Sequence, residues 1–576
     1  MTFTASVAAG DNAVTALRAL HESGIARGRV SFITHGDLAI AWSEDCRWID
    51  SHDDGNLLIL IDGHLHDPPV PRGRQAEMLA TRYQAKGIDF ATGLLGDFVV
   101  IVLDRMTAHL SVSRDPLGVR PWFLATSGNL HSGASDLATL ASLPWVQTEV
   151  DEPVVIEYLA ARSQSRGPTF YRGIRTLRPG ETWHRRDQGA RTFRHHRWNL
   201  QPDPGISFDD AAERCRVLLD EAVRCRLHAG EPATSELSGG LDSSSVVGTI
   251  AKLGWSDLAV GRLLFDTPRA DERFYSDAVV AHWGIPAVSS PPWLPTPEEG
   301  WELTRRLQRP VPDPHFTMFT GLHRLLLQHG RPAGLTGLGG DDAFVSADIA
   351  SRALSAVYLR QGRVLRELFG GFRGQPSSAW REVVKPTLHR LAPWKGARLP
   401  PWISNRAANE AGLPQRLREH SVRVTGIPAI DFRIQNLTTG YDAFVLETAA
   451  IVNDEAGRRQ SHPYLDPRFI EATYGLDPSW PSRGGHTRAL QVAAYRDRLP
   501  PAVATRRSKV EFSEIFWPQV LVEEILRAIR TGPLAERGWL DDTGFEELTL
   551  KAQRGMATAA IPLSRCVSVD RWLRSL

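Results

Sequence analysis

The residues best placed to do chemistry form one short stretch, Ser238-Gly239-Gly240-Leu241-Asp242-Ser243-Ser244. Two adjacent glycines let the backbone approach a ligand with no Cβ in between. Their N–H groups, together with those at the start of a following helix, can surround an anion. The serine hydroxyls add further donors, and Asp242 can hold a metal ion. The stretch therefore predicts a pyrophosphate cradle, and it differs from the Gly-x-x-x-x-Gly-Lys-Ser/Thr phosphate loop.

The elements that must hold this stretch alternate between strand and helix from residue 206 onward. We expect a strand over 234–237, then the loop, then a helix from Ser244 to Leu253. Further elements continue the pattern, with strands over 258–265 and 332–336 and helices over 208–227 and 270–283. Such alternation is typical of a parallel sheet with helices on its faces. Ligands of these sheets bind at the carboxyl ends of the strands, where the loop lies.

The first loop resembles the Ser-Gly-Gly-x-Asp-Ser signature of the N-type ATP pyrophosphatase superfamily. Members of that superfamily cleave ATP between the α- and β-phosphates and place AMP on an oxygen of the substrate. The resemblance implies that ATP and pyrophosphate contact Leu237, Ser238, Gly239, Gly240, Asp242, Ser243 and Ser244, with Gly337 from a second loop. The plain alternative is an ordinary turn rich in glycine and serine.

The second loop, Leu335-Thr336-Gly337-Leu338-Gly339-Gly340-Asp341-Asp342, ends the strand expected at 332–336. It resembles the Ser-Gly-Glu-Gly-Ser-Asp-Glu loop of asparagine synthetases and its counterpart in β-lactam synthetases. In those enzymes the aspartate that matches Asp341 binds Mg²⁺ together with the aspartate of the first loop, here Asp242. Magnesium takes oxygen ligands, and one or two carboxylates with phosphate and water satisfy it. The alternative is a glycine-rich turn with an unrelated acid.

A third segment, Arg506-Arg507-Ser508-Lys509-Val510-Glu511-Phe512, resembles the Arg-x-Lys-x-x-Phe segment of the same family. The family's lysine lies over the reacting phosphate or tetrahedral centre. Lysine is scarce in this chain, and its compact ammonium differs from a guanidinium in reach and donor geometry. Lys509 is therefore the candidate for stabilising charge in the transition state, with a surface lysine as the alternative.

Near the third segment, Pro463-Tyr464-Leu465-Asp466 resembles the family's Pro-Phe-Leu-Asp landmark, which is structural. The Glu-x-Arg that usually precedes this landmark is replaced by Arg459-Gln460-Ser461. We therefore carry over no substrate contact to these three residues.

The first part of the chain reads as short strands, expected over 56–63, 96–104 and 109–113. The turn from Arg114 to Phe123 follows them and resembles the class II glutamine amidotransferase domain of asparagine synthetases. The segment 169–181 resembles the exit of the same domain. A boundary is expected at Pro202 to Gly205, where turn-forming residues cluster.

We therefore predict an α/β protein of two domains. Residues 1–204 form a degenerate glutamine amidotransferase-like domain, an α+β unit built on a β-sandwich. Residues 205–576 form an N-type ATP pyrophosphatase domain with a parallel sheet and helical inserts.

Two positions separate this chain from the glutamine-using members of the family. A working glutaminase of this class needs a cysteine directly after the initiator methionine, because the free α-amine of that cysteine serves as the base. Residue 2 is Thr2 and the nearest cysteine is Cys46, so we expect no release of ammonia from glutamine. Leu338 stands where asparagine synthetases carry glutamate and β-lactam synthetases carry tyrosine. A leucine can neither order ammonia nor accept a proton.

The combination resembles the macrolactam synthetases of lasso-peptide biosynthesis, which pair an inert amidotransferase-like domain with both loops. The resemblance implies ATP and Mg²⁺ as cofactors and a core peptide as substrate. An Asp or Glu side chain of the peptide would be adenylated and joined to the peptide's own N-terminal amine. AMP and pyrophosphate are released. A leader peptidase and a leader-recognition protein are the implied partners.

Two other functions remain open from the sequence. One is a β-lactam- or carbapenam-type, or other standalone, amide synthetase acting on a small amino acid. The other is a catalytically dead scaffold, against which the intact Asp242, Asp341 and Lys509 argue. Three acids in an expected helical region, Glu447, Asp454 and Glu455, are equally placed to be the general base.

Composition and charge restrict the classes of partner and the cellular compartment that we expect. A formal net charge of +1 gives no general case for nucleic acid or membrane surfaces as partners. No apolar run approaches the roughly 18 residues of a spanning helix. Residues 1–17 carry no basic side chain, so they lack the front of a secretory signal. The four cysteines have no zinc-binding spacing and are predicted to be buried free thiols of a cytoplasmic protein.

The region 351–425 differs from the rest in charge, because residues 351–420 contain 13 basic residues and four glutamates. Tryptophans at 380, 394 and 402 interleave with them. We expect a basic helical insert. It is either a solvated face, a docking surface for an acidic or peptidic partner, or a contact for nucleic acid.

Overall fold

The computed structural model describes most of the chain. The described residues are 5–22, 29–160, 167–186, 189–203, 205–228, 230–268, 270–293, 297–311, 317–344, 357, 384, 399–419, 425–477, 480, 488–506, 526–527 and 529–576. Thr2, Lys509 and most of the basic insert predicted at 351–425 lie outside these ranges.

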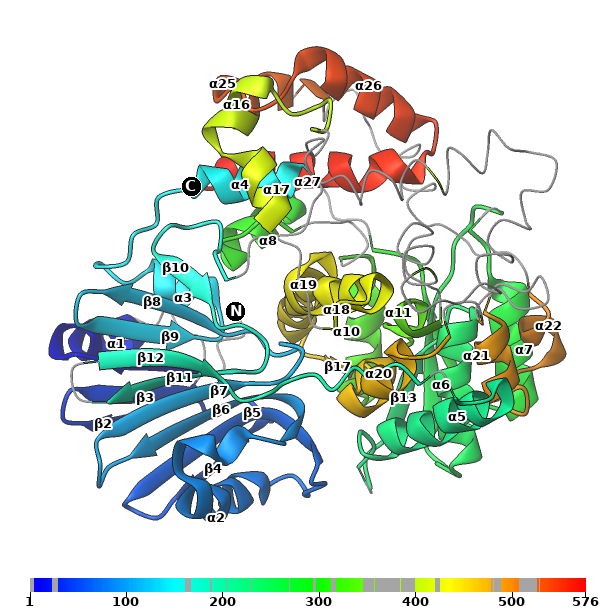
Figure 1. The fold of residues 1–576 in the computed structure, drawn as a ribbon, viewed down its shortest axis with the longest axis horizontal. Helices are drawn as coiled ribbons and strands as arrows, with labels where there is room; N and C mark the ends of the chain where they lie inside the picture. The colour runs from blue at the N-terminus through cyan, green and yellow to red at the C-terminus, as the bar shows by residue number, and fades with distance from the viewer. Residues whose placement is uncertain are drawn as a thin grey trace.

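The N-terminal domain is a sandwich of two six-stranded antiparallel sheets (Figure 1). The first sheet has the order β10-β8-β9-β1-β3-β2, with β1 (Ala5–Ala9), β2 (Val30–His35), β3 (Leu38–Ser43), β8 (Phe123–Ser127), β9 (Leu130–Ala134) and β10 (Ile174–Thr176). The second has the order β12-β11-β7-β6-β5-β4, with β4 (Ile49–Asp53), β5 (Leu57–Asp67), β6 (Leu95–Asp104), β7 (His109–Arg114), β11 (Glu181–Arg186) and β12 (Gly189–Arg194). The strands expected at 56–63, 96–104 and 109–113 are β5, β6 and β7.

Alternation along β5 and β6 explains why both strands read as unbroken apolar runs. Leu58 and Leu60 of β5 pack between the two sheets, whereas Ile59 and Ile61 pack under helix α2 (Gln75–Lys86). Successive side chains of a strand point to opposite faces, and here both faces are covered. Short helices complete the domain: α1 (Asp11–Glu22), η1 (Gly87–Ala91), α3 (Leu137–Ala141) and α4 (Glu152–Leu159).

The second domain is built on a five-stranded parallel sheet with the order β15-β14-β13-β16-β17. Its strands are β13 (Ala233–Glu236), β14 (Leu258–Leu263), β15 (Ala287–Ser290), β16 (Ala333–Leu335) and β17 (Arg459–Ser461). The chain runs outward from β13 on one side and from β16 on the other. The boundary between β13 and β16 is therefore a topological switch point, where ligands of open α/β sheets bind. The α/β fold predicted from the alternating pattern is confirmed.

Helices cover both faces of this sheet. One group consists of α5 (Phe208–Arg224), α6 (Leu241–Lys252), α7 (Arg273–Trp283), α21 (Ala489–Tyr495) and α22 (Pro501–Ala504). The other elements nearby are α10 (Thr320–Gln328), α11 (Gly340–Phe344), α18 (Pro428–Thr439), α19 (Tyr441–Glu455), η4 (Pro463–Leu465) and α20 (Pro467–Tyr474). Ser207 caps α5 by accepting the N–H of Asp210, so this helix begins where the sequence predicts. The expected boundary at 204/205 falls between β12 and α5 and stays a prediction.

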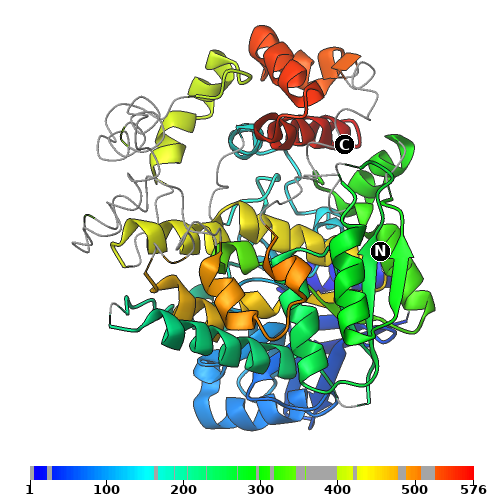
Figure 2. The same cartoon turned by 90° about the vertical axis from the view of Figure 1, so that its right-hand side faces the viewer.

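A third layer of helices lies above both domains in Figures 1 and 2. It contains α8 (Pro297–Leu307), α16 (Asn405–Glu410), α17 (Leu413–Glu419), α25 (Pro533–Glu536), α26 (Asp542–Gln553) and α27 (Ala557–Leu573). The Trp402 indole N–H donates to the carbonyl of Leu159 at 2.9 Å, and Arg416 pairs with Glu157 at 3.0 Å. Residues 399–419 of the predicted insert therefore pack against α4 of the first domain.

Two sequence-level expectations concern cysteines and membranes. All four cysteines are free; Cys215 and Cys566 are buried, while Cys46 and Cys225 are only half-buried. None of the helices in the described ranges combines the length and the apolar character needed to cross a bilayer.

Candidate active site

The first loop connects the end of β13 to the start of α6. Gly239 has a φ of +84°, and a Cβ there would lie 2.7 Å from the backbone nitrogen of Ser276. Only glycine fits such a left-handed, crowded position. The N–H of Gly240 donates to the hydroxyl of Ser238 at 3.2 Å, and Ser238 N–H donates to the hydroxyl of Ser243 at 3.2 Å. The loop is thus closed on itself at the N-terminus of a helix, which favours an anion.

The second loop follows β16 and lies directly against the first. A Cβ on Gly337 would lie 2.5 Å from the backbone nitrogen of Ser243, and one on Gly340 would lie 2.2 Å from Oδ1 of Asp242. Glycine at both positions therefore lets the two loops touch. This contact brings Asp341, the residue after Gly340, to the same place as Asp242.

One guanidinium joins the two aspartates. Nη1 of Arg488 lies 2.6 Å from both carboxylate oxygens of Asp242, and its Nη2 pairs with Asp341. Gln491 donates to Oδ1 of Asp242 at 2.8 Å. Because a single cationic group reaches both acids, the pair can also share one divalent ion, and oxygen donors suit Mg²⁺. The Asp242 side chain is 19% exposed and that of Asp341 49%, so an ion can reach both.

Arg488 is a site residue that the sequence analysis missed. It precedes α21 with a φ of 72°, an unusual conformation for a residue other than glycine. It lies 246 residues after Asp242, and the chain carries many other arginines. The available signal was indirect: two carboxylates that converge require a cation between them.

Arg506 places the start of the third segment beside the first loop. Its Nη1 donates to the carbonyl of Gly239 at 3.2 Å, and its guanidinium pairs with Glu272 and lies 4.1 Å from the ring centre of Tyr275. Lys509, three residues further on, lies outside the described residues. The chain that carries Lys509 therefore leaves from the glycine cradle.

Leu338 sits in the second loop with 40% of its surface exposed. Its N–H donates to the hydroxyl of Thr336 at 3.2 Å, and the same hydroxyl lies 2.7 Å from Nδ1 of His462. The side chain itself brings no polar group to the place where the two loops meet.

Residues 463–466, the structural landmark, pack against the second loop. A Cβ on Gly339 would lie 2.3 Å from Leu465, so the landmark and the loop are in contact. Asp466 is held by Arg226 at 2.8 Å and by Arg468 at 2.9 Å. Burial acts to raise the pKa of Asp466, but the two guanidiniums together outweigh it and lower the pKa to about 2.

The segment Arg459-Gln460-Ser461, which departs from the family pattern, forms β17 and connects the two domains. Arg459 pairs with Asp62 at 2.5 Å, and the Ser461 hydroxyl donates to Asp97 at 2.8 Å. Both acids belong to strands of the N-terminal sandwich. The segment is thus part of the domain interface. The amide of Gln460 also donates to Glu236 at the end of β13.

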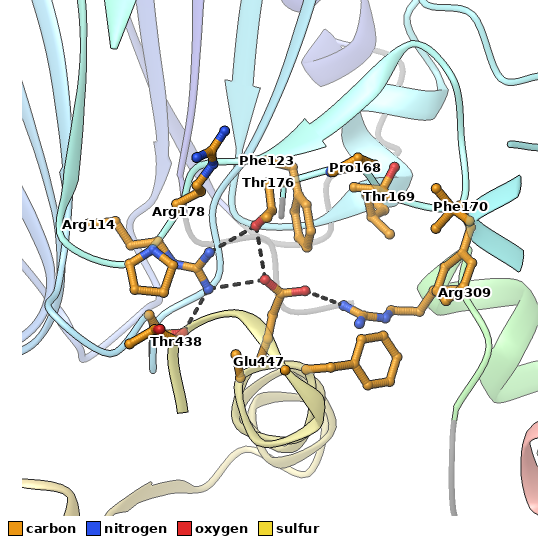
Figure 3. A pocket seen from close by; sticks show the side chains of 18 of the residues that line it. Arg114, Phe123, Pro168, Thr169, Phe170, Thr176, Arg178, Arg309, Thr438 and Glu447 are labelled. Atoms are coloured by element: carbon orange, nitrogen blue, oxygen red, sulfur yellow. Dashed lines mark hydrogen bonds and ion pairs between the residues drawn. The ribbon is translucent and has the colours of Figure 1, made fainter. Parts of the chain in front are cut away.

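The three acids weighed as a general base lie on α19 and are all ion-paired. Glu447 pairs with Arg309 at 2.8 Å and with Arg114 at 3.1 Å (Figure 3). Asp454 pairs with Arg120 at 2.6 Å, and Glu455 with Arg306 at 3.5 Å. Burial acts to raise the pKa of Glu447, yet its arginine neighbours prevail and lower it, so this carboxylate stays ionised. These contacts tie α19 to the interface with the sandwich.

Two cavities lie at this interface, and each has a volume of about 70 Å³. One surrounds Glu447 and is shown in Figure 3; the other is lined by His64, Arg72 and β17. Pockets for small molecules usually measure roughly 300–1,000 Å³. Neither cavity reaches that size, and neither is lined by residues of the first loop. The candidate active site is instead the place where the two loops meet, because Asp242 and Asp341 converge there.

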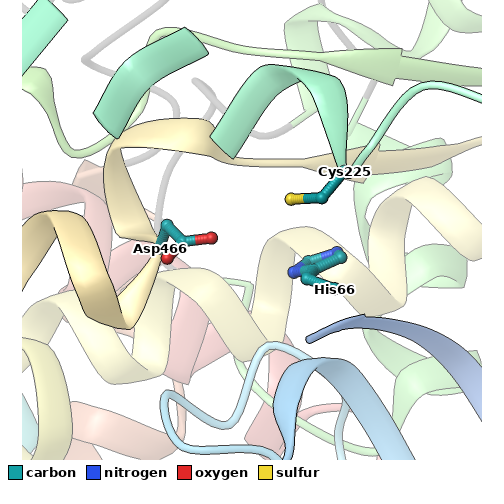
Figure 4. A group of neighbouring side chains, drawn as sticks. All are labelled: His66, Cys225 and Asp466. Carbon is teal, nitrogen blue, oxygen red and sulfur yellow. The ribbon is translucent and has the colours of Figure 1, made fainter. Parts of the chain in front are cut away.

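A cluster of possible metal ligands, His66, Cys225 and Asp466, occurs between the domains (Figure 4). Both oxygens of Asp466 already accept hydrogen bonds from guanidiniums, and the Cys225 sulfur lies 3.5 Å from Arg226 and from Arg468. Burial raises the pKa of the Cys225 thiol, although metal binding requires the thiolate. These ligand atoms already bind two guanidiniums that also hold the landmark in place, so we assign the cluster a structural role and no metal ion.

Comparison with known proteins agrees with this architecture. The Asparagine synthase family matches residues 214–574, and the Glutamine amidotransferase domain matches residues 73–198. Asparagine synthetase 3 (glutamine-hydrolyzing) of Bacillus subtilis is 29% identical over 182 residues, covering 31% of this chain and 29% of that protein. Amidase chry2 of Gibberella zeae is 27% identical over 251 residues, covering 40% of this chain and 35% of that protein. The chain spans about a third of the length of these relatives.

Among solved structures, glutamine phosphoribosylpyrophosphate amidotransferase from B. subtilis is 12% identical with a TM-score of 0.25, covering 60% of this chain and 82% of that chain. This likeness is too slight to carry an argument. The match over residues 214–574 takes in both loops and the parallel sheet that positions them. The chain belongs to the asparagine synthase family.

Proposed function

We propose that this protein is an ATP-dependent, AMP-forming amide ligase that closes a macrolactam ring in a lasso-type peptide. The observation that carries the ligase part is the convergence of Asp242 and Asp341 on one cationic group, beside a glycine cradle at the switch point of the sheet. Asp242 and Asp341 would hold Mg²⁺, which when bound neutralises phosphate charge.

The steps follow from the proposed roles. ATP binds along Leu237–Ser244 and the residues from Gly337 to Asp341. A side-chain carboxylate of the peptide attacks the α-phosphorus, and pyrophosphate leaves into the glycine cradle, with Lys509 stabilising the charge. The peptide's own N-terminal amine then attacks the acyl-adenylate and expels AMP. Holding both ends of one chain in the crevice makes this second step effectively intramolecular.

The amine is proposed to come from the substrate and not from glutamine. The first cysteine of the sequence is Cys46, which lies between β3 and β4 of the sandwich. Burial, assisted by the charge of Asp62, raises the pKa of this thiol, so it stays protonated and poorly nucleophilic at neutral pH. Leu338 supports the same proposal, because its side chain gives ammonia no hydrogen-bond partner in the crevice.

The peptide specificity adds further proposals. A leader peptidase and a leader-recognition protein are the proposed partners, in a cytoplasmic setting. The basic region 351–425 is proposed to hold the peptide or these partners through arginine and tryptophan side chains. Within the described residues 399–419, Trp402 and Arg416 contact α4 of the first domain.

Product analysis tests the ligase part of the proposal. The purified protein is incubated with ATP, Mg²⁺ and precursor peptides, and the nucleotides are separated by chromatography. We expect AMP and pyrophosphate in equal amounts, with turnover unchanged when glutamine and ammonium are removed. ADP as the main nucleotide product contradicts adenylation, and glutamate release coupled to product formation contradicts the inert N-terminal domain.

Mass spectrometry tests the substrate class. Candidate precursor peptides are incubated with the enzyme, a leader peptidase and ATP. We expect loss of one water, with fragmentation that shows a ring between the N-terminus and an Asp or Glu side chain. Failure with these peptides together with cyclisation of a carboxyethyl-type amino acid moves the assignment to a β-lactam-type synthetase.

A further inference from the structure

Glu236 is a charged residue at the end of the central strand of the parallel sheet. It is the last residue of β13, lies opposite Gly261 of β14, and directly precedes Leu237 and the glycine cradle. A carboxylate between buried strands is costly unless it is hydrogen-bonded. The adenylation chemistry described above gives this side chain no role. Its presence therefore requires a separate explanation.

The hydrogen bonds of Glu236 converge on one of its two oxygens. His323 of α10 donates from Nε2 to Oε1 at 2.7 Å, and the amide of Gln460 donates to the same oxygen. Asn453 of α19 in turn donates to the Gln460 carbonyl at 2.7 Å, which fixes the orientation of that amide. Within the described part of the chain, these bonds leave Oε2 available. The Glu236 side chain is 16% exposed, whereas that of His323 is 2% exposed, so solvent contacts the glutamate side chain and not the ring.

Glu236 lies at the end of β13, immediately before the first loop, and on the strand that neighbours β16, which leads into the second loop. Ser235 pairs with Leu335 of β16, and Leu335 pairs with Ser461 of β17. The next residue on each strand is therefore Glu236, Thr336 and His462 in a row across the switch point. Thr336 accepts the N–H of Leu338, so the row lies directly beneath the second loop. The row therefore borders the start of both loops.

The groups that face Glu236 keep it ionised at neutral pH. Burial acts to raise its pKa, but the hydrogen bond from His323 and the charge of Arg458 outweigh burial and lower the pKa below its usual range. Burial lowers the pKa of His323 and brings that of His462 to about 4, so both rings are neutral at pH 7. Arg458, whose pKa falls to about 10 chiefly through burial, keeps its charge there. The open oxygen therefore carries negative charge under working conditions.

We propose that Glu236 is the residue that receives the amine nucleophile, by accepting its N–H hydrogens at Oε2 and directing its lone pair at the acyl-adenylate. The proposal rests on the amide-forming function proposed above. An ionised carboxylate with one oxygen satisfied by neutral donors and the other open is suited to a primary amine or ammonium. It stands apart from Asp242 and Asp341, so it is not needed for the metal ion.

The chemistry explains why a permanently charged carboxylate suits this role. When the amine attacks, the carbon–nitrogen bond forms and nitrogen becomes positive. The bond from the acyl carbon to the AMP oxygen breaks, AMP keeps the electron pair, and the surplus protons on nitrogen pass to water. A fixed negative charge beside nitrogen stabilises this positive charge as it develops. Glu236 thus acts on the second half-reaction and not on adenylation.

Separate assays of the two half-reactions test the proposal. Adenylation is measured as exchange of labelled pyrophosphate into ATP. Amide formation is measured by mass spectrometry of a candidate precursor peptide that the unmodified protein cyclises. For Glu236→Gln we expect exchange within about twofold of the unmodified protein and amide formation slower by about 10²-fold. AMP released per ring formed should rise, because the stranded adenylate hydrolyses. Glu231 is a partly exposed acid that pairs with Arg72 of the first domain at 2.9 Å. Glu231→Gln is therefore the matched control and should leave both rates unchanged.

A second variant separates a functional role from a structural one. Glu236→Asp keeps the charge and should keep exchange and recover part of the amide-forming rate. Loss of exchange in both variants assigns the network to the fold of the loop and overturns the proposal, as does unchanged amide formation in Glu236→Gln. If the substrate proves to be a small amino acid, the same comparison applies to its amine. Absence of exchange in the unmodified protein with any carboxylate refutes the ligase function itself.

Discussion

Pairs of arginine and carboxylate occur at two places in this molecule, and they differ in what surrounds them. Between the loops, one guanidinium, Arg488, serves Asp242 and Asp341 at a partly exposed position. Between the domains, Arg120 bridges Asp62 and Asp454 at a buried position, and Arg459 contacts the same two acids. The first set has more negative charge than positive, whereas the second is balanced.

This difference implies that the cation between the loops can be replaced by another cation, whereas the arginines between the domains cannot. A buried pair has already lost its hydration, so removing one partner leaves an uncompensated charge and costs about 3–5 kcal/mol. An open site with two acids and one arginine can instead accept another cation at little cost. We infer that the interface pairs hold the domains together, while the loop pair is arranged to bind a ligand.

The largest effect is expected at the loop pair. Asp242→Asn and Asp341→Asn each remove a carboxylate on which the divalent ion depends, so pyrophosphate exchange should fall by 10³-fold or about that much. Thermal unfolding should stay close to that of the unmodified protein, because both side chains are partly exposed. Exchange that survives either substitution at near-normal rate would remove that aspartate from the site.

The interface pairs should show the opposite behaviour. Arg120→Met leaves Asp62 and Asp454 without one of their charge partners, and urea unfolding should show a loss of about 3–5 kcal/mol. Arg105→Met removes a pair with Asp53 at the surface and provides the control, with an expected loss of at most about 1 kcal/mol. Equal destabilisation by the two substitutions would contradict the distinction between buried and open pairs.

The sequence identified the loops because their chemistry is local. Glycines at fixed spacing and an aspartate after them are visible in a single stretch, and the alternation of elements placed both loops at strand ends. Arg488 was not predictable in this way, because its partners lie about 150 and 250 residues away and an arginine beside a helix start has many uses. The roles of Glu447 and Asp454 depend on which face of α19 meets the sandwich, which sequence spacing does not reveal.

Residues 399–419 show a second kind of limit. Their arginines and tryptophan predicted a solvated or docking face, yet Trp402 and Arg416 bind α4 of the first domain. Long amphipathic side chains serve equally well at a surface and in a packed interface. Composition alone therefore could not separate the two outcomes, whereas a single tertiary contact does.

Lys509 tests whether the third segment of the family resemblance, residues 506–512, acts in chemistry. Lys509→Met should slow pyrophosphate exchange by about 10²-fold, because a charge held over the reacting phosphorus is lost. Lys551→Met provides the control, since Lys551 is partly exposed and pairs with Glu547 one helical turn away at the surface. Turnover near normal for Lys509→Met would assign that lysine to the surface.

The smallest expected effect concerns Arg488 itself. It tests most directly whether a metal ion can replace this guanidinium between the two aspartates. If this guanidinium occupies the position of the divalent ion, Mg²⁺ must displace it, and its charge opposes Mg²⁺ binding. Two charges about 4 Å apart interact by about 4 kcal/mol near a protein surface, and the exposure of Asp341 reduces this further. Arg488→Gln should therefore tighten Mg²⁺ binding by about tenfold in calorimetry without ATP, while Arg488→Lys should leave it nearly unchanged. Weaker Mg²⁺ binding by Arg488→Gln would show that the arginine organises the two aspartates and does not compete for them, and the loop pair would then resemble the permanent pairs of the interface.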